Sequence, residues 1–244
     1  MPNELTSFVT KYVEDHIEVF HQHRLAKVKT LKLRDVLKRK NPYLYKAKHF
    51  ETSDIIVKGI VDAYLSSSEE GIFGDWLEGL AISTNKKVFG GRKSAVIGMD
   101  LEFDIGNERQ LVAIKSGRNW GNSSQRKKLK QDFQTGKRTL RTGNAGLQVK
   151  AVLGCCCGRK KKADMAGYYE YCGERFWEYI SGESTLYKDI IQPLGHGAKQ
   201  QTERFTTEYT KLINKFNREF LSAYVSADGG INWDKIVELV SRKY

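Results

Sequence analysis

The sequence predicts an α/β fold, in which a mixed central sheet is flanked by helices and further helical segments lie at the N- and C-terminal ends. Three observations favour this fold. Apolar residues recur at helical spacing over most of the chain, a pair of short alternating strands lies near residues 98–116, and an apolar run over 147–158 has strand length and glycines near its ends. Hydrophobic residues make up 40% of the 244 positions, which is enough for a substantial core.

The first part of the chain predicts helices over residues 5–30, 53–70 and 74–83. A break is expected at Asn41-Pro42, because a residue before proline avoids the helical conformation. The stretch GMDLEFDIGNERQLVAIKSG then predicts two strands joined by a tight turn at Gly106-Asn107.

The second part of the chain predicts a helix that begins at Asn122 or Ser123, followed by the strand at 147–158. The helices expected after this strand cover residues 173–182, a segment from 185 that Pro193 limits, 206–225, and 232–244, the last capped by Asn232.

The charge of the chain predicts a polyanionic partner. The formal net charge is +12, from 41 basic and 29 acidic side chains. The basic residues cluster at 24–40, at 124–141 and in the GRKKK stretch at 158–162, whereas basic residues that serve solubility alone need no clustering.

Other classes of protein are disfavoured. Three of the four cysteines are adjacent, which suits neither a disulfide framework nor a zinc site, so Cys155–Cys157 are expected at a buried strand end. No apolar run reaches the about 18 residues that span a bilayer, and the N-terminus lacks the layout of a signal peptide. We expect a cytoplasmic protein without a membrane partner.

The strand pair gathers charged residues on one face. Because strand side chains alternate, Asp100, Glu102 and Asp104 share a face, and Lys115 shares a face with Leu111 and Ala113. Carboxylates and a backbone carbonyl are the oxygen ligands that Mg²⁺ prefers, and a nearby lysine would stabilise charge on a phosphodiester that is being hydrolysed. On spacing alone, a solvated strand face fits these residues better than a catalytic site.

Several motifs in order resemble one family of type II restriction endonucleases of the PD-(D/E)XK nuclease superfamily. They are NPYL, FGDWLEGLAI, GMDLEF, IKSGRNWGNSSQ, VLGCCCG, YCGERFWEYISG and LYKDIIQPLG, and they cover roughly residues 40–240. The resemblance implies a cytoplasmic enzyme of a bacterium or archaeon that cleaves double-stranded DNA at a short palindromic site. It also implies Mg²⁺ as cofactor, with Mn²⁺ as a substitute, a homodimer, and a DNA methyltransferase of the same system that makes no direct contact.

The resemblance also assigns roles to residues. Asp100 takes the place of the metal-binding aspartate, Lys115 that of the catalytic lysine, and the backbone carbonyl of Ile114 that of the main-chain metal ligand. Ala113 departs from the pattern, which has an acid there. The missing acid is expected to be Glu102 or Glu78, with Asp75 a weaker candidate, unless Ala113 is an engineered inactivating change.

Residues 1–50 are interpreted as a basic helical segment for DNA contact or dimerisation, and residues 51–244 as the nuclease domain. A dimer is expected through the first helix (Phe8, Tyr12, Phe20) rather than through residues 201–225 (Tyr209, Phe216, Phe220). Trp120 and Asn119 either form loop core or shape the cleft. The candidate DNA-binding residues are Arg118, Asn119, Asn122, Ser123, Gln125, Arg126, Lys127, Lys128 and Lys130.

Two other functions stay open on the sequence. One is a repair or junction nuclease of the same fold, and the other is a non-catalytic DNA-binding protein that has kept this fold, for which Ala113 is the main support. The sequence does not identify the recognition site or the cut position, because many arginine, lysine and asparagine side chains could read bases.

Overall fold

A computed structural model describes residues 4–161 and 163–243. The chain forms two compact units. The first comprises Met1–Glu18 and Phe73–His196, and the second comprises Val19–Ile72 and Gly197–Tyr244. The predicted boundary near residue 50 lies inside the second unit, and the roles assigned to residues 1–50 and 51–244 stay predictions.

The first unit contains a mixed sheet whose strand order follows the chain order, β1-β2-β3-β4-β5. The first three strands are antiparallel, and β3, β4 and β5 are parallel. The predicted α/β class is therefore confirmed. The strands are β1 (Arg92–Lys93), β2 (Leu101–Ile105), β3 (Glu108–Lys115), β4 (Gln148–Cys155) and β5 (Tyr169–Cys172).

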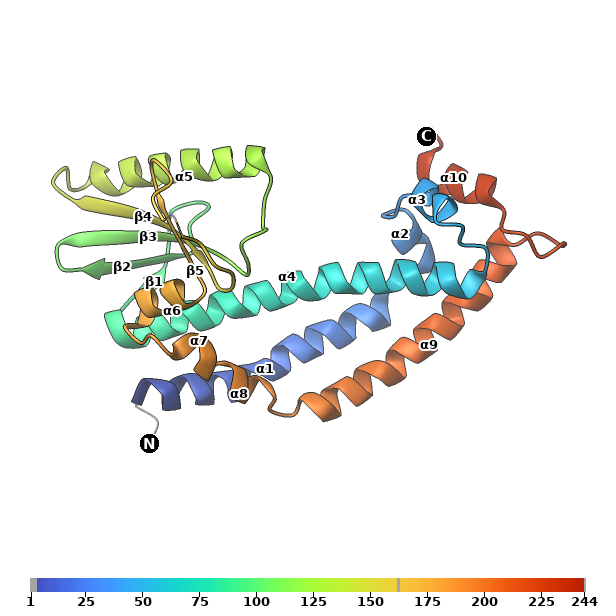
Figure 1. Ribbon diagram of the computed structural model, residues 1–244, viewed down its shortest axis with the longest axis horizontal. Helices are drawn as coiled ribbons and strands as arrows, with labels where there is room; N and C mark the ends of the chain where they lie inside the picture. Colours follow the sequence, from blue (N-terminus) through green and yellow to red (C-terminus); the bar gives the residue numbers. More distant parts are fainter. Residues whose placement is uncertain (1–3, 162, 244) are drawn as a thin grey trace. The chain divides into compact units, whose positions relative to one another are not determined.

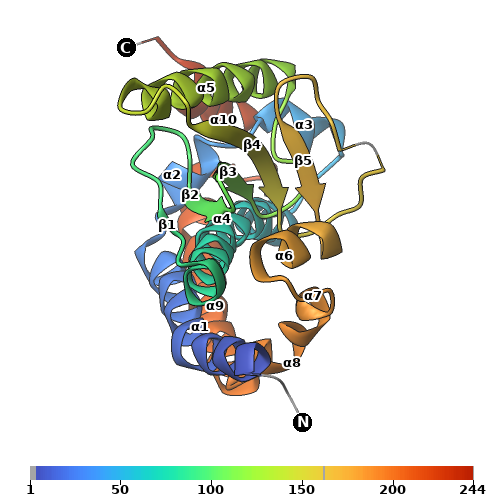
Figure 2. The ribbon, with the colours of Figure 1, turned by 90° about the vertical axis from the view of Figure 1, so that its left-hand side faces the viewer.

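Helices cover both faces of this sheet (Figures 1 and 2). Helix α5 (Ser123–Thr142) buries Leu129 and Phe133 in a cluster with Cys155 of β4. Helix α6 (Glu174–Ser181) lies on the opposite face, because Phe176 packs against Gly154, whose neighbour Cys155 points to α5. The short helices α7 (Leu186–Asp189) and α8 (Ile191–Leu194) follow α6.

One expectation about the elements is wrong, and two short strands were missed. Residues 53–70 and 74–83 form one helix, α4 (Ser53–Phe89), instead of two. Gly71 and Gly74 do not end it, because a glycine inside a helix costs only about 1 kcal/mol relative to alanine and no proline intervenes. The short strands β1 and β5 were not predicted, since runs of two and four residues carry too little periodicity.

The second unit is helical in the part of the chain that the structure describes. It contains α2 (Leu33–Leu37), α3 (Pro42–Ala47), α9 (Ala198–Tyr224), α10 (Trp233–Ser241) and parts of α1 (Glu4–Thr30) and α4. Asn41 caps α3 and Asn232 caps α10 through their side-chain oxygens, the latter as predicted.

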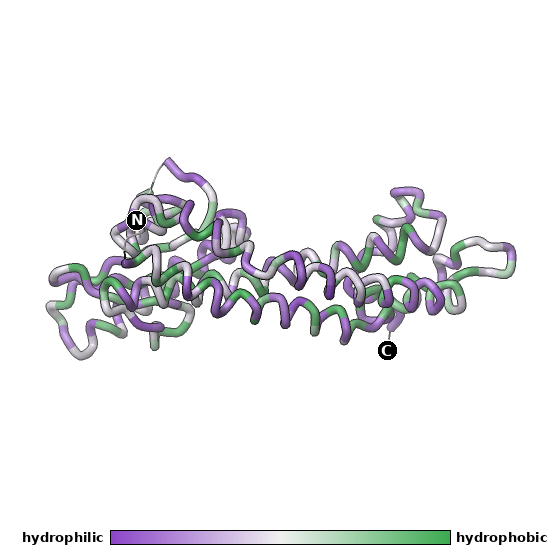
Figure 3. Tube along the Cα trace, turned by 90° about the horizontal axis from the view of Figure 1, so that it is seen from below, coloured by the Kyte–Doolittle hydropathy of each residue, from purple (hydrophilic) through white to green (hydrophobic). Residues whose placement is uncertain are grey.

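The apolar side of α9 is used inside its own unit. Leu212, Phe216 and Phe220 are buried in one core cluster with Val36 and Ile60. These residues therefore offer no free surface for a dimer. In Figure 3, hydrophobic and hydrophilic positions alternate along the long helices, and no described helix is apolar enough over its length to cross a membrane.

Candidate active site

Asp100 and Lys115 lie at neighbouring strand ends in the first unit. Asp100 immediately precedes β2, and its backbone N–H donates to the carbonyl of Val112 on β3 (2.8 Å). Its Oδ2 accepts a hydrogen bond from the backbone N–H of Ile114 (2.7 Å), which fixes the carboxylate against β3. Lys115 is the last residue of β3 and is half-buried.

Glu78 joins this pair from helix α4. Its carboxylate forms an ion pair with Lys93 of β1, at 3.6 Å between Oε1 and Nζ. The charges of Asp100 and Lys115 both act on Glu78, and Lys115 and Lys93 act on Asp100. The structure therefore groups two of the predicted acids and the predicted lysine, and adds Lys93, which the sequence analysis did not single out.

The surroundings of Asp100 and Glu78 disfavour the ionised form of both carboxyl groups. Burial raises the pKa of Asp100, although the Ile114 N–H, Lys115 and Lys93 act in the opposite direction. Burial also raises the pKa of Glu78, and the negative charge of Asp100 raises it further. Two partly buried carboxylates that repel each other are a setting in which an added cation is stabilising.

The backbone of β3 completes a set of oxygen donors that fits Mg²⁺. The carbonyl of Lys115 accepts from the N–H of Cys156, the residue that follows β4 (2.8 Å). Successive carbonyls of a strand point in opposite directions, so the carbonyl of Ile114 lies on the β2 side, where Asp100 is. Glu78, Asp100 and the Ile114 carbonyl thus offer hard oxygen ligands of the kind that magnesium binds.

Glu102 has other partners. Its side chain is 4% exposed, and its Oε2 accepts from Arg92 and Arg109, at 3.1 Å each. Its Oε1 accepts from the hydroxyl of Ser94 (2.7 Å). Both carboxylate oxygens are therefore already hydrogen-bonded, and the charge is already balanced. Of the two candidates for the missing acid, the structure groups Glu78 and not Glu102 with Asp100 and Lys115.

Ala113 is fully buried in the cluster that α5 forms with the sheet. Asp75, the weaker candidate, is exposed one turn before Glu78 on α4, and its charge has a small effect on Glu78. The position that carries an acid in the family pattern is thus occupied here by Ala113, a residue of the hydrophobic core.

Some predicted DNA-binding residues have structural partners at the start of α5. Asn122 and Gln125 form a capping box, in which the Asn122 side chain accepts from the N–H of Gln125 (3.0 Å) and the Gln125 side chain accepts from the N–H of Asn122 (2.9 Å). These amides therefore stabilise the helix start in the DNA-free chain. Ser123 and Asn119 are exposed beside them.

The basic candidates divide into engaged and exposed side chains. Arg118 donates to the Arg159 carbonyl (3.3 Å), and Arg126 donates to the Arg118 carbonyl (3.1 Å). Lys128 is paired with Asp132 (2.8 Å) but stays 73% exposed, and Lys127 is exposed. Lys130 is half-buried. Of the basic candidates, Lys127 and Lys128 are therefore the most accessible to DNA phosphates.

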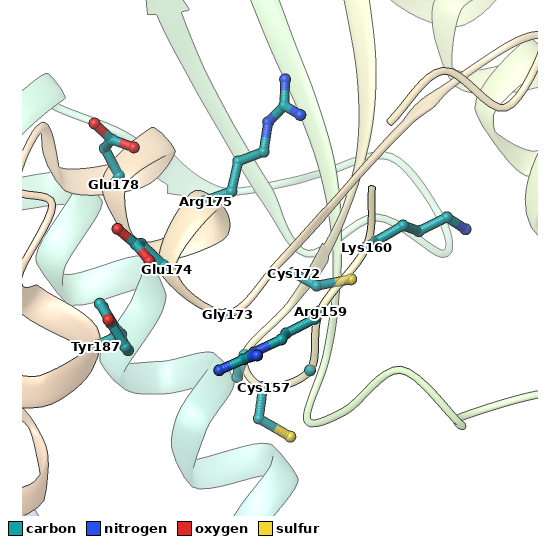
Figure 4. A pocket seen from close by; sticks show the side chains of 11 residues that line it. Cys157, Arg159, Lys160, Cys172, Gly173, Glu174, Arg175, Glu178 and Tyr187 are labelled. Atoms are coloured by element: carbon teal, nitrogen blue, oxygen red, sulfur yellow. The ribbon is translucent and has the colours of Figure 1, made fainter. Parts of the chain in front are cut away.

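A cavity of about 770 Å³ adjoins the ends of β4 and β5. Figure 4 shows Glu174, Glu178 and Tyr187 on one side and Arg159 with Cys157 on the other. The lining charges are mixed, so the cavity is not a simple anion site. Cys155 and Cys156 are buried at the strand end, as predicted, and Cys157 is exposed; all three thiols are free.

The mixed sheet with flanking helices is a nuclease fold, and the acids and the lysine lie together at one end of it. The model of the family described as Type II restriction endonuclease EcoO109I matches residues 7–202. The chain belongs to this family of type II restriction endonucleases, which confirms the resemblance drawn from the sequence motifs. No curated protein matches the chain.

Proposed function

We propose that this protein is a Mg²⁺-dependent endonuclease that hydrolyses phosphodiester bonds in both strands of DNA at a short palindromic site. The observation that carries the proposal is the grouping of Glu78, Asp100 and Lys115 at the end of the β2–β3 hairpin. This arrangement corresponds to the PD-(D/E)XK motif with its second acid supplied by α4, because position 113 is an alanine.

The residues of this site have distinct roles in the proposed reaction. Asp100, Glu78 and the Ile114 carbonyl would hold Mg²⁺, which would polarise the phosphodiester and activate a water for attack. Lys115 orients the attacking water and stabilises negative charge on the phosphate oxygens as one P–O bond forms and the other breaks. The Ile114 N–H holds the Asp100 carboxylate in place throughout (2.7 Å).

DNA binding in this proposal relies first on the phosphate backbone. The net charge of +12 supplies a sequence-independent attraction, and Lys127 and Lys128 are exposed on α5. Residues that read bases come from the same region, where Arg118, Asn119 and Ser123 are also exposed. A methyltransferase of the same system would protect the same site by modifying its bases.

Cleavage of plasmid DNA tests the proposal. With Mg²⁺ the wild-type chain is expected to give discrete bands, and with chelator none. Lys115→Ala and Asp100→Asn are expected to abolish cutting while DNA binding persists, because they remove transition-state stabilisation and metal affinity. Lys188→Ala, an exposed lysine on α7, is the matched control and should cut normally.

The other outcomes identify the alternatives. Relaxed or smeared products would indicate a repair or junction nuclease. A mobility shift without any cut would indicate a non-catalytic DNA-binding protein, in which Ala113 marks the lost activity. Cutting at the normal rate by either Lys115→Ala or Asp100→Asn would show that the active site lies elsewhere.

A further inference from the structure

We propose that Trp120 is a positioning residue for Lys115, and that the buried carboxylate of Glu170 holds Trp120 in place through Arg126. The inference rests on the proposed function, because it gives Lys115 its catalytic role. It assigns a role to Glu170, decides in favour of a cleft-shaping role for Trp120, and gives Arg126 a role besides that of a candidate DNA-binding residue.

The indole of Trp120 lies between two cations. The Lys115 ammonium is 5.9 Å from the ring centroid, and the Arg126 guanidinium carbon is 5.3 Å from it. Contacts of this length are attractive, because the ring face is negative. Trp120 also packs against the core cluster between α5 and the sheet, so the ring has a fixed backing. Its indole N–H is buried and has no hydrogen-bond partner among the described residues.

Arg126 is held on three sides. Its guanidinium donates to the carbonyl of Arg118 (3.1 Å), it lies over Trp120, and it is 3.6 Å from Glu170 Oε2. The first contact ties the loop that follows β3 to the first turn of α5. The guanidinium therefore fixes both the ring and the backbone of the segment that runs from Lys115 to the helix.

Glu170 is the anchor of the chain of contacts. It lies on β5, its side chain is fully buried, and it is paired with Lys160 as well as with Arg126. A buried carboxylate with two cationic partners keeps them in place, because separation would leave a charge unpaired in the interior. The contacts thus run from the sheet edge at Glu170, through Arg126 and Trp120, to Lys115.

Glu170 could alternatively be read as a metal ligand, because it lies with the Cys155 and Cys172 sulfurs within 4.8 Å. Both thiols are buried, and burial raises the pKa of each. Lys160 and Arg126 already balance the carboxylate charge. An anchoring role therefore fits this group better than a metal centre.

Positioning matters at Lys115 because the lysine side chain is long and flexible and stands on the last residue of β3. If the lysine side chain populates many rotamers, only a small fraction of the molecules have the ammonium where it can act on a phosphate. A ring face beside it narrows that range without neutralising the charge.

Rate and affinity measured separately test this role. In single-turnover cleavage, Trp120→Leu is expected to lower the rate constant about 10-fold or more, with the affinity for DNA unchanged. Trp120→Phe, which keeps a ring, should retain most of the rate. Arg126→Met and Glu170→Gln should give intermediate losses of rate. Arg218→Met on α9 and Glu174→Gln on α6, both exposed, are the matched controls.

A second measurement does not depend on cutting. Reductive ¹³C-methylation keeps the lysine charge, and Lys115→Arg identifies the Lys115 methyl resonance. That resonance is expected upfield of the other lysines through the ring current of Trp120, and Trp120→Leu should return it to the common position. Glu170→Gln and Arg126→Met should move it part of the way, and the two controls should leave it unchanged.

The two experiments separate the two proposals. An unshifted Lys115 resonance, or one that Trp120→Leu leaves unchanged, would overturn the positioning role whether or not the protein cuts. The positioning role would also be overturned if Trp120→Phe lost as much cleavage rate and as much folding stability as Trp120→Leu. A shifted resonance in a protein whose Lys115→Ala variant cuts normally would leave the positioning intact and refute the proposed function.

Discussion

At the scale of single residues, Glu78 and Glu102 show how the same side chain is put to different uses. Glu78 is partly buried near Asp100, and it forms an ion pair of 3.6 Å with Lys93. Glu102 is buried between Arg92, Arg109 and Ser94, with both oxygens engaged. The first carboxylate can accept a metal ion, whereas the second stabilises the edge of the sheet.

Glutamine substitutions separate these two uses. Glu78→Gln is expected to lower the cleavage rate on the order of 100-fold or more, without loss of folding stability. Glu102→Gln is expected to lower the free energy of unfolding by about 1–3 kcal/mol, because it weakens two arginine contacts. Cleavage assays and urea titrations of both variants measure this difference. Normal cutting by Glu78→Gln would return Glu102 to consideration as the second acid.

The raised pKa values of Asp100 and Glu78 predict a pH dependence of stability. In metal-free protein, the folded state keeps these protons to higher pH than the unfolded chain, whose carboxyl groups lose them near pH 4 or just above. The stability that Asp100 and Glu78 contribute is therefore present at low pH. It is lost as the pH rises above the pKa of these groups in the unfolded chain and through their higher pKa in the folded protein.

The double variant Asp100→Asn and Glu78→Gln removes this effect. It is expected to be more stable than the wild type at neutral pH, and the difference should vanish below about pH 4. Urea unfolding over this range in the presence of chelator gives the measurement. A difference in stability that does not change with pH would contradict the burial of these two charges.

At the scale of elements, helix α5 presents lysines to solvent beside the site. Replacement of Lys127, Lys128 and Lys130 by alanine is expected to weaken binding to all DNA sequences alike, because phosphate contacts carry no sequence information. Each lost contact should reduce the slope of log K against log salt by about 0.9. Lys211→Ala and Lys215→Ala on α9 are controls, and an unchanged slope would make these α5 lysines merely solvated.

Two glycines in regular elements are expected to respond oppositely to alanine. Gly71 lies inside α4 with open space around its Cα, so Gly71→Ala should stabilise the protein by about 0.5–1 kcal/mol. A methyl group at Gly154 on β4 would collide with the ring of Phe176, so Gly154→Ala should destabilise it by about 1–3 kcal/mol. Thermal unfolding of both variants checks the signs, and a stabilised Gly154→Ala would contradict the packing of α6 on β4.

The sequence predicts long elements well and contacts between distant elements poorly. The hairpin, α5 and α9 follow from the periodicity of apolar residues and from helix caps. The sequence predicts two helices where α4 is one, because Gly71 and Gly74 interrupt the apolar periodicity without ending the helix itself. Glu78 was a candidate from the motif, but its choice over Glu102 depends on which arginines reach Glu102. The pair of Arg126 and Glu170, 44 positions apart, has no local signal at all.

At the scale of the whole molecule, the proposed cleavage of a palindromic site predicts a homodimer, because two equivalent scissile bonds need two equivalent sites. The apolar side of α9 is buried in its own unit, so it offers no surface for a dimer. The dimer is therefore expected to form through α1, where Phe8 and Tyr12 are only partly buried. Light scattering should give about twice the chain mass of 27.9 kDa, and Phe8→Ser with Tyr12→Ser should reduce it toward the monomer. A monomer that stays monomeric with cognate DNA would count against the restriction-type function.

The sequential strand order also bears on how the protein forms during synthesis. Each strand of the sheet can add to the edge left by the strand before it, so Glu78, Asp100 and Lys115 are all translated before β4 and β5 exist. The first unit is complete once His196 has left the ribosome, whereas the second must wait for residues after 197 to cover its apolar residues. A nascent chain would thus complete the unit that carries the proposed active site first and the other unit last.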